Sequence, residues 1–165
     1  MAKKTLIVLR HAKSSWRTPD VDFRRPLAER GIEDARTAGA LLSGYDLDLV
    51  LCSAATRARQ TWENAELGGA SCERVEFAEA IYHAWPDELL SELRDLDEAT
   101  ATVLLIGHQP TLSDLVLSLS KPSDLTREVG ARFPTCALSV LTYRGGWKTL
   151  DRGKAVLKAY EIPRA

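Results

Sequence analysis

The chain has 165 residues, of which 45% are hydrophobic and 27% are charged, and its formal net charge at pH 7 is −1. This balance is typical of a globular protein and excludes intrinsic disorder, and the near-neutral charge argues against a general nucleic-acid binder. No stretch approaches the roughly 18 consecutive apolar residues of a membrane span, so we expect neither a membrane nor a nucleic acid as partner. The length predicts a single domain over residues 1–165.

The start of the chain and the cysteine count both favour a cytoplasmic location. After Met1-Ala2-Lys3-Lys4, the first apolar run meets Arg10 too early to be the core of a signal peptide. The three cysteines, Cys52, Cys72 and Cys136, are odd in number and widely spaced, which argues against a disulfide framework and a zinc ribbon.

Short apolar runs predict the strands. The first, Thr5-Leu6-Ile7-Val8-Leu9, is continuous and β-prone, as in a strand that is buried on both faces. The predicted strands, in chain order, cover residues 5–9, 49–52, 75–77, 103–106, 137–141 and, more weakly, 155–160.

Amphipathic segments lie between several of these strands and predict helices. Apolar residues recur at helical spacing in three of them, namely Ile32, Ala35, Gly39 and Leu42, then Leu89, Leu93 and Leu96, then Leu112, Leu115, Val116 and Leu119. Strands that alternate with helices imply crossover connections, a mostly parallel central sheet and helices on both faces. The predicted fold class is therefore α/β in a single domain.

Polar residues that can take part in binding or catalysis follow three of the predicted strands. Arg10 and His11 follow the first strand, Ser53 to Arg59 follow the second, and Gly107 and His108 follow the strand at 103–106. In open α/β sheets, ligands bind at the carboxyl ends of the strands. We therefore expect two histidines and several arginines to converge on one rim, although they are about a hundred positions apart in sequence.

The residues around this rim have the chemistry of a phosphate site. Ser53 is a good N-cap for a helix from Ala54 to about Glu66, which places Arg57 near exposed amide donors and the positive end of the helix dipole. Pro110 is suited to the first position of the next helix. Arg10 at a strand end can donate two parallel hydrogen bonds to a phosphoryl group.

An imidazole flanked by arginines suits nucleophilic catalysis. Neighbouring positive charge favours the neutral ring, whose free nitrogen can attack phosphorus and form a phosphohistidine that water later hydrolyses. Arginines and a second histidine would stabilise the charge on the phosphoryl oxygens. This chemistry requires no metal and no cofactor. A zinc site from His11, His83 and His108 is disfavoured by their spacing and by the nearby arginines.

Three motifs in matching order resemble the histidine phosphatase superfamily, which includes the phosphoglycerate mutases and acid phosphatases. Leu9-Arg10-His11-Ala12 resembles its Arg-His-Gly signature, with Ala12 in place of the usual glycine. Ser53-Ala54-Ala55-Thr56-Arg57-Ala58-Arg59-Gln60-Thr61 is similar to its Ser-x-x-x-Arg-Ala-x-x-Thr motif, and Gly107-His108-Gln109-Pro110 to its Gly-His-x-Pro motif. The segment Asp22 to Leu27 and Gly31 are similar to the region after the first motif. The small size and the Arg-His-Ala-Lys-Ser start resemble the SixA branch, the phosphohistidine phosphatases.

The resemblance implies a phosphoglycerate mutase-like fold and a role for each matching residue. It implies that His11 is the phosphorylated nucleophile and that Arg10, Arg57 and His108 bind the phosphoryl group. Glu79 is the closest match to the general acid of the family, Asp87 is an alternative, and SixA-type enzymes can lack this acid altogether. The larger mutases enclose their substrates with insertions, so this shorter chain favours an open pocket and hydrolysis.

The expected activity is metal-independent hydrolysis, most simply of phosphohistidine on a protein. One alternative is a phosphomonoesterase acting on a small phosphorylated metabolite, and another is a phospho-binding module without turnover. Among the other aromatic residues, His83 is expected to be a rim or packing residue. Trp16 either lines the pocket or packs over the sheet edge, and Trp62 and Trp147 are expected in the core.

Overall fold

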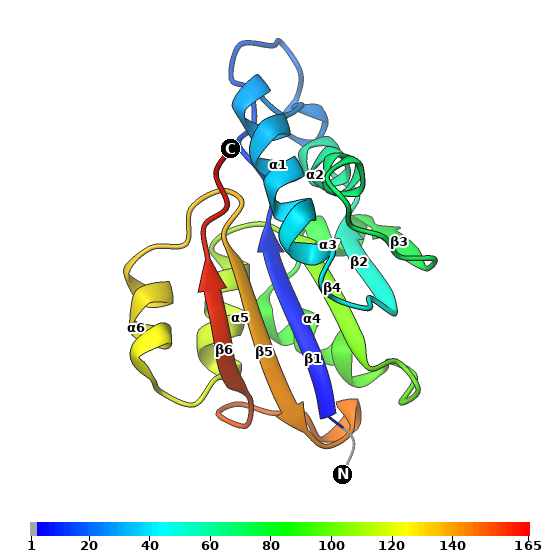
Figure 1. The fold of residues 1–165 in the computed structure, drawn as a ribbon, viewed down its shortest axis with the longest axis vertical. Coiled ribbons are helices and arrows are strands. Elements are labelled where there is room, and N and C mark those ends of the chain that lie inside the picture. The colour runs from blue at the N-terminus through cyan, green and yellow to red at the C-terminus, as the bar shows by residue number, and fades with distance from the viewer. Residues whose placement is uncertain (1–2) are drawn as a thin grey trace.

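Six strands form one mixed sheet in a computed structural model that describes residues 3–165 (Figure 1). Met1 and Ala2 lie outside the described residues, so the predicted domain is described from Lys3 onward. The strands are β1 (Lys3–Arg10), β2 (Leu49–Ser53), β3 (Val75–Ala78), β4 (Thr102–Gly107), β5 (Leu138–Arg144) and β6 (Val156–Glu161).

The order of the strands in the sheet is β3-β2-β4-β1-β5-β6. The pairs β2–β3, β2–β4 and β1–β4 are parallel, whereas β5 runs antiparallel to both of its neighbours, β1 and β6. The sheet is thus mostly parallel, with one reversed strand. The carboxyl ends of β2, β4 and β1, which carry the three motifs, lie next to one another.

Helices cover both faces of this sheet. The helical elements are η1 (Asp22–Arg24), α1 (Glu29–Leu42), α2 (Thr56–Leu67), α3 (Glu79–Tyr82), α4 (Pro86–Arg94), α5 (Thr111–Leu119), α6 (Asp124–Ala131) and η2 (Trp147–Thr149). In Figure 1, α1 and α2 lie in front of the sheet, whereas α4 and α5 lie behind it. The α/β class predicted from the sequence is confirmed.

Alternation along the buried strands divides the core into two clusters. Leu6 and Val8 of β1 pack with residues of α4 and α5 on one face, whereas Ile7 and Leu9 pack with residues of α1 and α2 on the other. Trp147 belongs to the first cluster and Trp62 to the second, and both side chains are buried, as the sequence predicts. Two-sided burial of this kind is what a continuous apolar run requires.

Two predicted helix starts are wrong by one or more residues. Ser53 is the last residue of β2 rather than an N-cap, because α2 begins at Thr56 after the N-cap residue Ala55. Pro110 is the N-cap residue of α5 rather than its first helical residue. In both cases the chain needs a short turn to leave the sheet before helical hydrogen bonding begins, and this turn carries functional side chains.

Within the described residues, no helix has both the length and the apolar character that a membrane crossing requires.

Candidate active site

A polar pocket of about 300 Å³ opens at the carboxyl ends of β1 and β4. Its walls come from the ends of these strands, from the start of α2 and from the long loop between β1 and α1. The residues that line it are Arg10, His11, Lys13, Ser14, Trp16, Arg25, Arg57, His108, Gln109 and Thr135. The structure therefore brings together the four motif residues that the sequence predicts to bind or attack a phosphoryl group: Arg10, His11, Arg57 and His108.

The backbone of His11 is fixed by the end of β4 and by the turn before β5. Its N–H donates to the carbonyl oxygen of Gly107 at 3.1 Å, and its own carbonyl accepts from the N–H of Cys136 at 3.0 Å. Its ring Nδ1 lies 2.7 Å from the carbonyl oxygen of Ala12. Because a carbonyl oxygen can only accept, Nδ1 carries the proton, and in the neutral ring the lone pair is on Nε2. The nucleophilic nitrogen is thus defined by the fold.

The same surroundings keep the His11 ring neutral. The pKa of His11 is lowered from 6.5 to about 3, chiefly by burial and also by the nearby His108, Arg57 and Arg10, whereas the hydrogen bond to Ala12 acts in the opposite direction. Burial is the largest cause of the lowered pKa, whereas the sequence indicated only the effect of the neighbouring charges. At neutral pH, Nε2 of His11 therefore has a free lone pair.

The loop after His11 is held by α2 and by α1. The N–H of Ala12 donates to Oγ1 of Thr61 at 2.9 Å, and the Thr61 hydroxyl donates to the carbonyl of Arg57 at 2.7 Å. A Cβ on Gly31 of α1 would lie 2.1 Å from the carbonyl oxygen of Lys13. Only glycine lets the start of α1 approach this closely, which explains why the motif region contains one here.

His108 faces His11 across the pocket, and the two ring centroids are 5.2 Å apart. Burial is the main cause that lowers its pKa to about 4, with a further contribution from Arg57. Its Nε2 shares a hydrogen bond of 2.7 Å with Oγ of Ser53, and its Nδ1 is buried without a hydrogen-bond partner. The true role of Ser53 is therefore to orient the second imidazole.

Several buried polar atoms of the pocket residues have no hydrogen-bond partner in the described part of the chain. Six buried side-chain polar atoms have no partner within the described residues, and four of them belong to residues that line the pocket: Nε of Arg10, Nε of Arg25, Nε of Arg57 and Nδ1 of His108. A buried polar group without a partner costs roughly 1–3 kcal/mol. Three arginines and one histidine line this pocket, and this set of groups suits an anion with several acceptor oxygens.

Asp22 in η1 holds Arg57 in place. Nη1 of Arg57 donates to the Asp22 backbone oxygen at 2.7 Å, and Nη2 donates to its carboxylate at 3.1 Å. The same carboxylate accepts from Arg25 at 3.2 Å and from the Tyr82 hydroxyl. The pKa of Asp22 falls to about 2, chiefly through the hydrogen bond from Tyr82. The carboxylate is ionised at neutral pH and serves as an acceptor that fixes Arg57.

Neither Asp22 nor Arg25 was predicted as a site residue. Arg25 is buried between the loop and the pocket, where it donates to Ser14, and its guanidinium stacks 3.6 Å from the ring of Trp16. Trp16 itself is 79% exposed and lines the pocket, which favours the first of its two predicted roles. The available signal was the spacing of Asp22 and Arg25 by three residues, which suits an ion pair within one turn.

The structure does not bring the two candidate acids into the pocket. Glu79 is exposed at the start of α3 and is not among the residues that line the pocket. Asp87 forms an exposed ion pair with Arg152 at 3.0 Å. His83 is exposed and packs against Tyr82 with ring centroids 4.6 Å apart, in line with the rim position predicted for it.

The described part of the chain contains no group of three His, Cys, Asp or Glu side chains that could hold a metal ion. The pocket instead presents arginines, which repel cations.

The family model for the histidine phosphatase superfamily (branch 1) matches residues 6–96. The chain belongs to this superfamily. An uncharacterized protein of Mycobacterium tuberculosis is 35% identical over 94% of this chain and 100% of its own length. An uncharacterized protein of Mycobacterium leprae is 34% identical over the same shares of the two chains.

Solved structures place this histidine phosphatase in the SixA-type branch. It is similar to a candidate phosphohistidine phosphatase SixA from Nakamurella multipartitia, with a TM-score of 0.85 and 30% identity over 100% of this chain and 99% of that one. A candidate SixA from Agrobacterium tumefaciens gives a TM-score of 0.80 and 29% identity over 97% and 98% of the two chains. The family and its fold, as expected from the three motifs, are confirmed.

Proposed function

We propose that this chain is a metal-independent phosphatase that works through a phosphohistidine on His11 and acts on phosphohistidine of a protein. The observation that carries the proposal is the arrangement around His11. A neutral imidazole with its lone pair on Nε2 lies in a pocket that three guanidinium groups also line. A phosphoryl group supplies acceptor oxygens for the guanidinium groups and an electrophile for that nitrogen.

The reaction has two balanced steps. In the first, Nε2 of His11 attacks phosphorus and the P–N bond to the substrate imidazole breaks, so that this imidazole leaves with the bonding electrons and takes up a proton. In the second, water attacks the phosphohistidine and releases phosphate and the neutral His11. Arg10, Arg57 and His108 hold the phosphoryl oxygens throughout, and charge on these oxygens is greatest in the transition states.

The shortage of an acid in the pocket favours a phosphoramidate as substrate. No carboxyl group lines the pocket, and the pKa of the neighbouring Asp22 is too low for proton donation at neutral pH. An ester releases an alkoxide, which needs a proton from a well-placed acid. Imidazole has a pKa near 6.5 and so leaves readily with a proton from solvent. We therefore assign no proton transfer to Glu79 or Asp87.

A labelling experiment tests the covalent step. The protein is incubated with ³²P-labelled phosphoramidate, quenched, and assayed for a phosphoryl group that is stable in alkali and labile in acid. We expect label on the wild type and on His83→Ala, a matched control outside the pocket, and none on His11→Ala. A chelator should leave turnover unchanged. Turnover that requires a metal, or that survives the loss of His11, would refute the mechanism.

Two alternatives give different outcomes in the same assays. A phosphomonoesterase would hydrolyse small phosphate esters with a kcat/KM at least equal to that for a phosphohistidine protein, whereas we expect a preference of tenfold or more for the phosphoramidate. A binding module would accept label without releasing phosphate. The neutral, oriented ring of His11 argues against this last alternative, because binding alone requires no nucleophile.

A further inference from the structure

A second basic cavity lies at the opposite end of the sheet from the phosphatase pocket. It has a volume of about 570 Å³ and is lined by Lys3, Lys121, Thr142, Tyr143, Arg144, Lys154, Val156 and Lys158. We call it the basic groove. Lys3 and Arg10 are the two ends of β1, and seven steps of about 3.3 Å separate them by roughly 23 Å. The basic groove is thus not an extension of the catalytic site.

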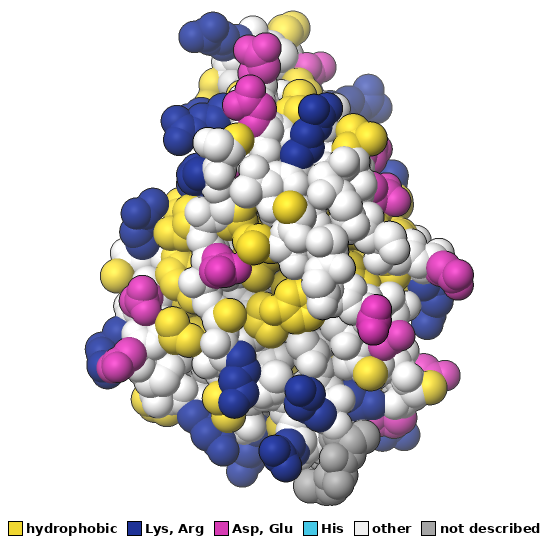
Figure 2. All heavy atoms as spheres, in the orientation of Figure 1, with side chains coloured by type: hydrophobic (Ala, Val, Ile, Leu, Met, Phe, Trp, Pro, Cys, Tyr) yellow, Lys and Arg dark blue, Asp and Glu magenta, His cyan; other side chains and the backbone are white. Residues whose placement is uncertain are grey.

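The basic groove carries five cations and no acid. None of the five forms an ion pair with any Asp or Glu of residues 3–165. Figure 2 shows Lys and Arg side chains gathered at this end of the molecule, over the start of β1, the end of β5 and the start of β6. This concentration of positive charge occurs in a chain whose net charge is −1.

The fold actively brings these charges together. Lys3 of β1 lies directly opposite Arg144 of β5 in the antiparallel register. Like charges at directly opposed positions destabilise a sheet, and neighbouring strands usually avoid them. Unfavourable local arrangements of this kind, when no other contact compensates for them, are concentrated at functional sites.

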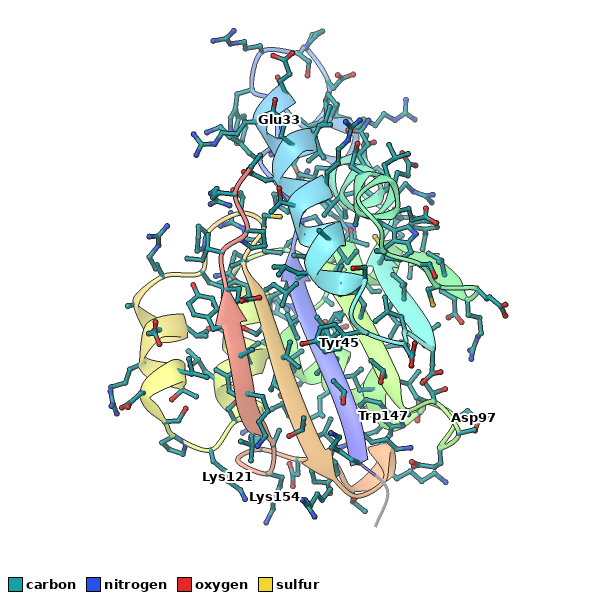
Figure 3. All side chains as sticks on the ribbon, viewed as in Figure 1. Glu33, Tyr45, Asp97, Lys121, Trp147 and Lys154 are labelled. Atoms are coloured by element: carbon teal, nitrogen blue, oxygen red, sulfur yellow. The ribbon has the colours of Figure 1, made fainter. Side chains whose placement is uncertain are left out.

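A second pairing adds two more cations from another part of the chain. The N–H of Lys121, just after α5, donates to the carbonyl of Ala155 at 2.8 Å, which fixes Lys121 beside the residue that follows Lys154. In Figure 3 the labelled Lys121 and Lys154 project from the same end of the molecule, beside the start of β6. Lys158 lies further along β6, and its side chain lines the same cavity.

We propose that the basic groove is a second anion site that binds a compound with several phosphate groups. The cavity is concave and of small-molecule size, which favours a compact polyanion over a flat protein surface. Five cations match a ligand of three or more negative charges, and such a ligand relieves the repulsion between Lys3 and Arg144. Thr142, whose side chain carries a neutral hydroxyl donor, also lines the groove.

An NMR titration with inorganic tripolyphosphate tests this site separately from the catalytic one. In the ¹⁵N-labelled wild type at low ionic strength, we expect amide shifts at Lys3, Arg144 and Lys158, with an affinity that falls as salt is added. Shifts near His11 report the phosphatase pocket and are fitted on their own. Inorganic phosphate should shift the amides near His11 at concentrations that leave the basic groove unchanged.

Charge removal then checks the assignment. Lys154→Ala combined with Lys158→Ala should weaken binding at the groove by tenfold or more and leave the shifts near His11 in place. Arg36→Ala removes an exposed charge on α1, outside the groove, and should change the groove affinity less than twofold. Lys121→Ala with Arg144→Ala gives an independent second pair.

Three results would each overturn the proposal. The first is a set of tripolyphosphate shifts confined to the phosphatase pocket. The second is an unchanged groove affinity in both double variants. The third is a groove that binds poly-glutamate and leaves tripolyphosphate free, which would identify an acidic polypeptide as the ligand instead.

Discussion

Asp22→Asn offers the sharpest test of how Arg57, the proposed phosphoryl-binding arginine, is held. The substitution keeps the shape of the side chain but removes the charge that accepts from Arg57, Arg25 and Tyr82. The backbone oxygen of residue 22 still accepts from Nη1 of Arg57, so the loop keeps one anchor. The variant therefore isolates the contribution of the carboxylate.

The size of the effect on stability follows from the pKa of Asp22. A fall of its pKa from 3.8 to about 2 corresponds to about 2.5 kcal/mol. The side chain is 51% exposed, and solvent screening at such a position reduces this contribution to about 1 kcal/mol. Because the folded-state pKa is the lower one, this stability is present above pH 3.8 and is lost as the pH falls towards 2. Urea unfolding should show Asp22→Asn to be about 1 kcal/mol less stable at pH 6, with a smaller difference at pH 3.

The effect on activity separates kcat from KM. Loss of the carboxylate lets the Arg57 guanidinium turn away from the transition state, and a loss of about 1.4 kcal/mol there lowers kcat about tenfold. The pocket also becomes more positive, so we expect KM for an anionic phosphoramidate to stay the same or fall.

A matched control removes a nearby charge without these contacts. Asp20→Asn changes an exposed carboxylate two residues earlier in the same loop and should leave both constants within twofold. If Asp22→Asn raises KM and preserves kcat, or if the two variants behave alike, Asp22 does not position Arg57.

Three further predictions concern the same pocket. Gly31→Ala forces a Cβ against the Lys13 carbonyl, so we expect the free energy of unfolding in urea to fall by about 1–3 kcal/mol and the activity to fall as well. In the control Gly44→Ala, the added Cβ meets only a carbonyl at 3.6 Å, so stability and activity should change little. Equal effects of the two substitutions would contradict the close approach of α1. His11 and His108 have folded-state pKa values of about 3 and 4, below 6.5, so the stability they contribute is present above pH 6.5 and falls as the pH drops towards 4. His11→Gln should therefore make the free energy of unfolding depend less steeply on pH in this range. An unchanged dependence would show that the ring is not held neutral. Glu79→Gln should leave the hydrolysis of both a phosphoramidate and a phosphate ester within twofold of wild type, and a selective loss on the ester would restore Glu79 as the general acid.

The strands and the motif residues could be predicted because their signals are local. A continuous apolar run such as residues 5–9 has few alternatives to a buried strand, and polar residues at strand ends meet wherever parallel strands are neighbours. Arg10, His11, Arg57 and His108 line one pocket for this reason. The starts of α2 and α5 were misplaced because the turn between strand and helix has no periodicity of its own.

The contacts of the long loop after β1 could not be predicted, because they depend on partners that are distant in sequence. Asp22 lies 35 positions from Arg57 and 60 from Tyr82, and no pattern in residues 11–28 links them. Of the adjacent Arg24 and Arg25, only Arg25 is buried, and the short η1 turn decides which of the two faces the pocket.

The distribution of charge over the whole molecule also depends on contacts between residues that are distant in sequence. A net charge of −1 indicated only that the chain is no general binder of nucleic acid. In the fold, cations that are far apart in sequence gather at both ends of β1, around His11 at one end and around Lys3 at the other. At the first end Arg25 and Arg57 are buried and oriented by Asp22, which suits the proposed covalent reaction on a phosphoryl group. At the second end the five cations are exposed and four of them are lysines, whose compact charge suits reversible binding of a compact polyanion.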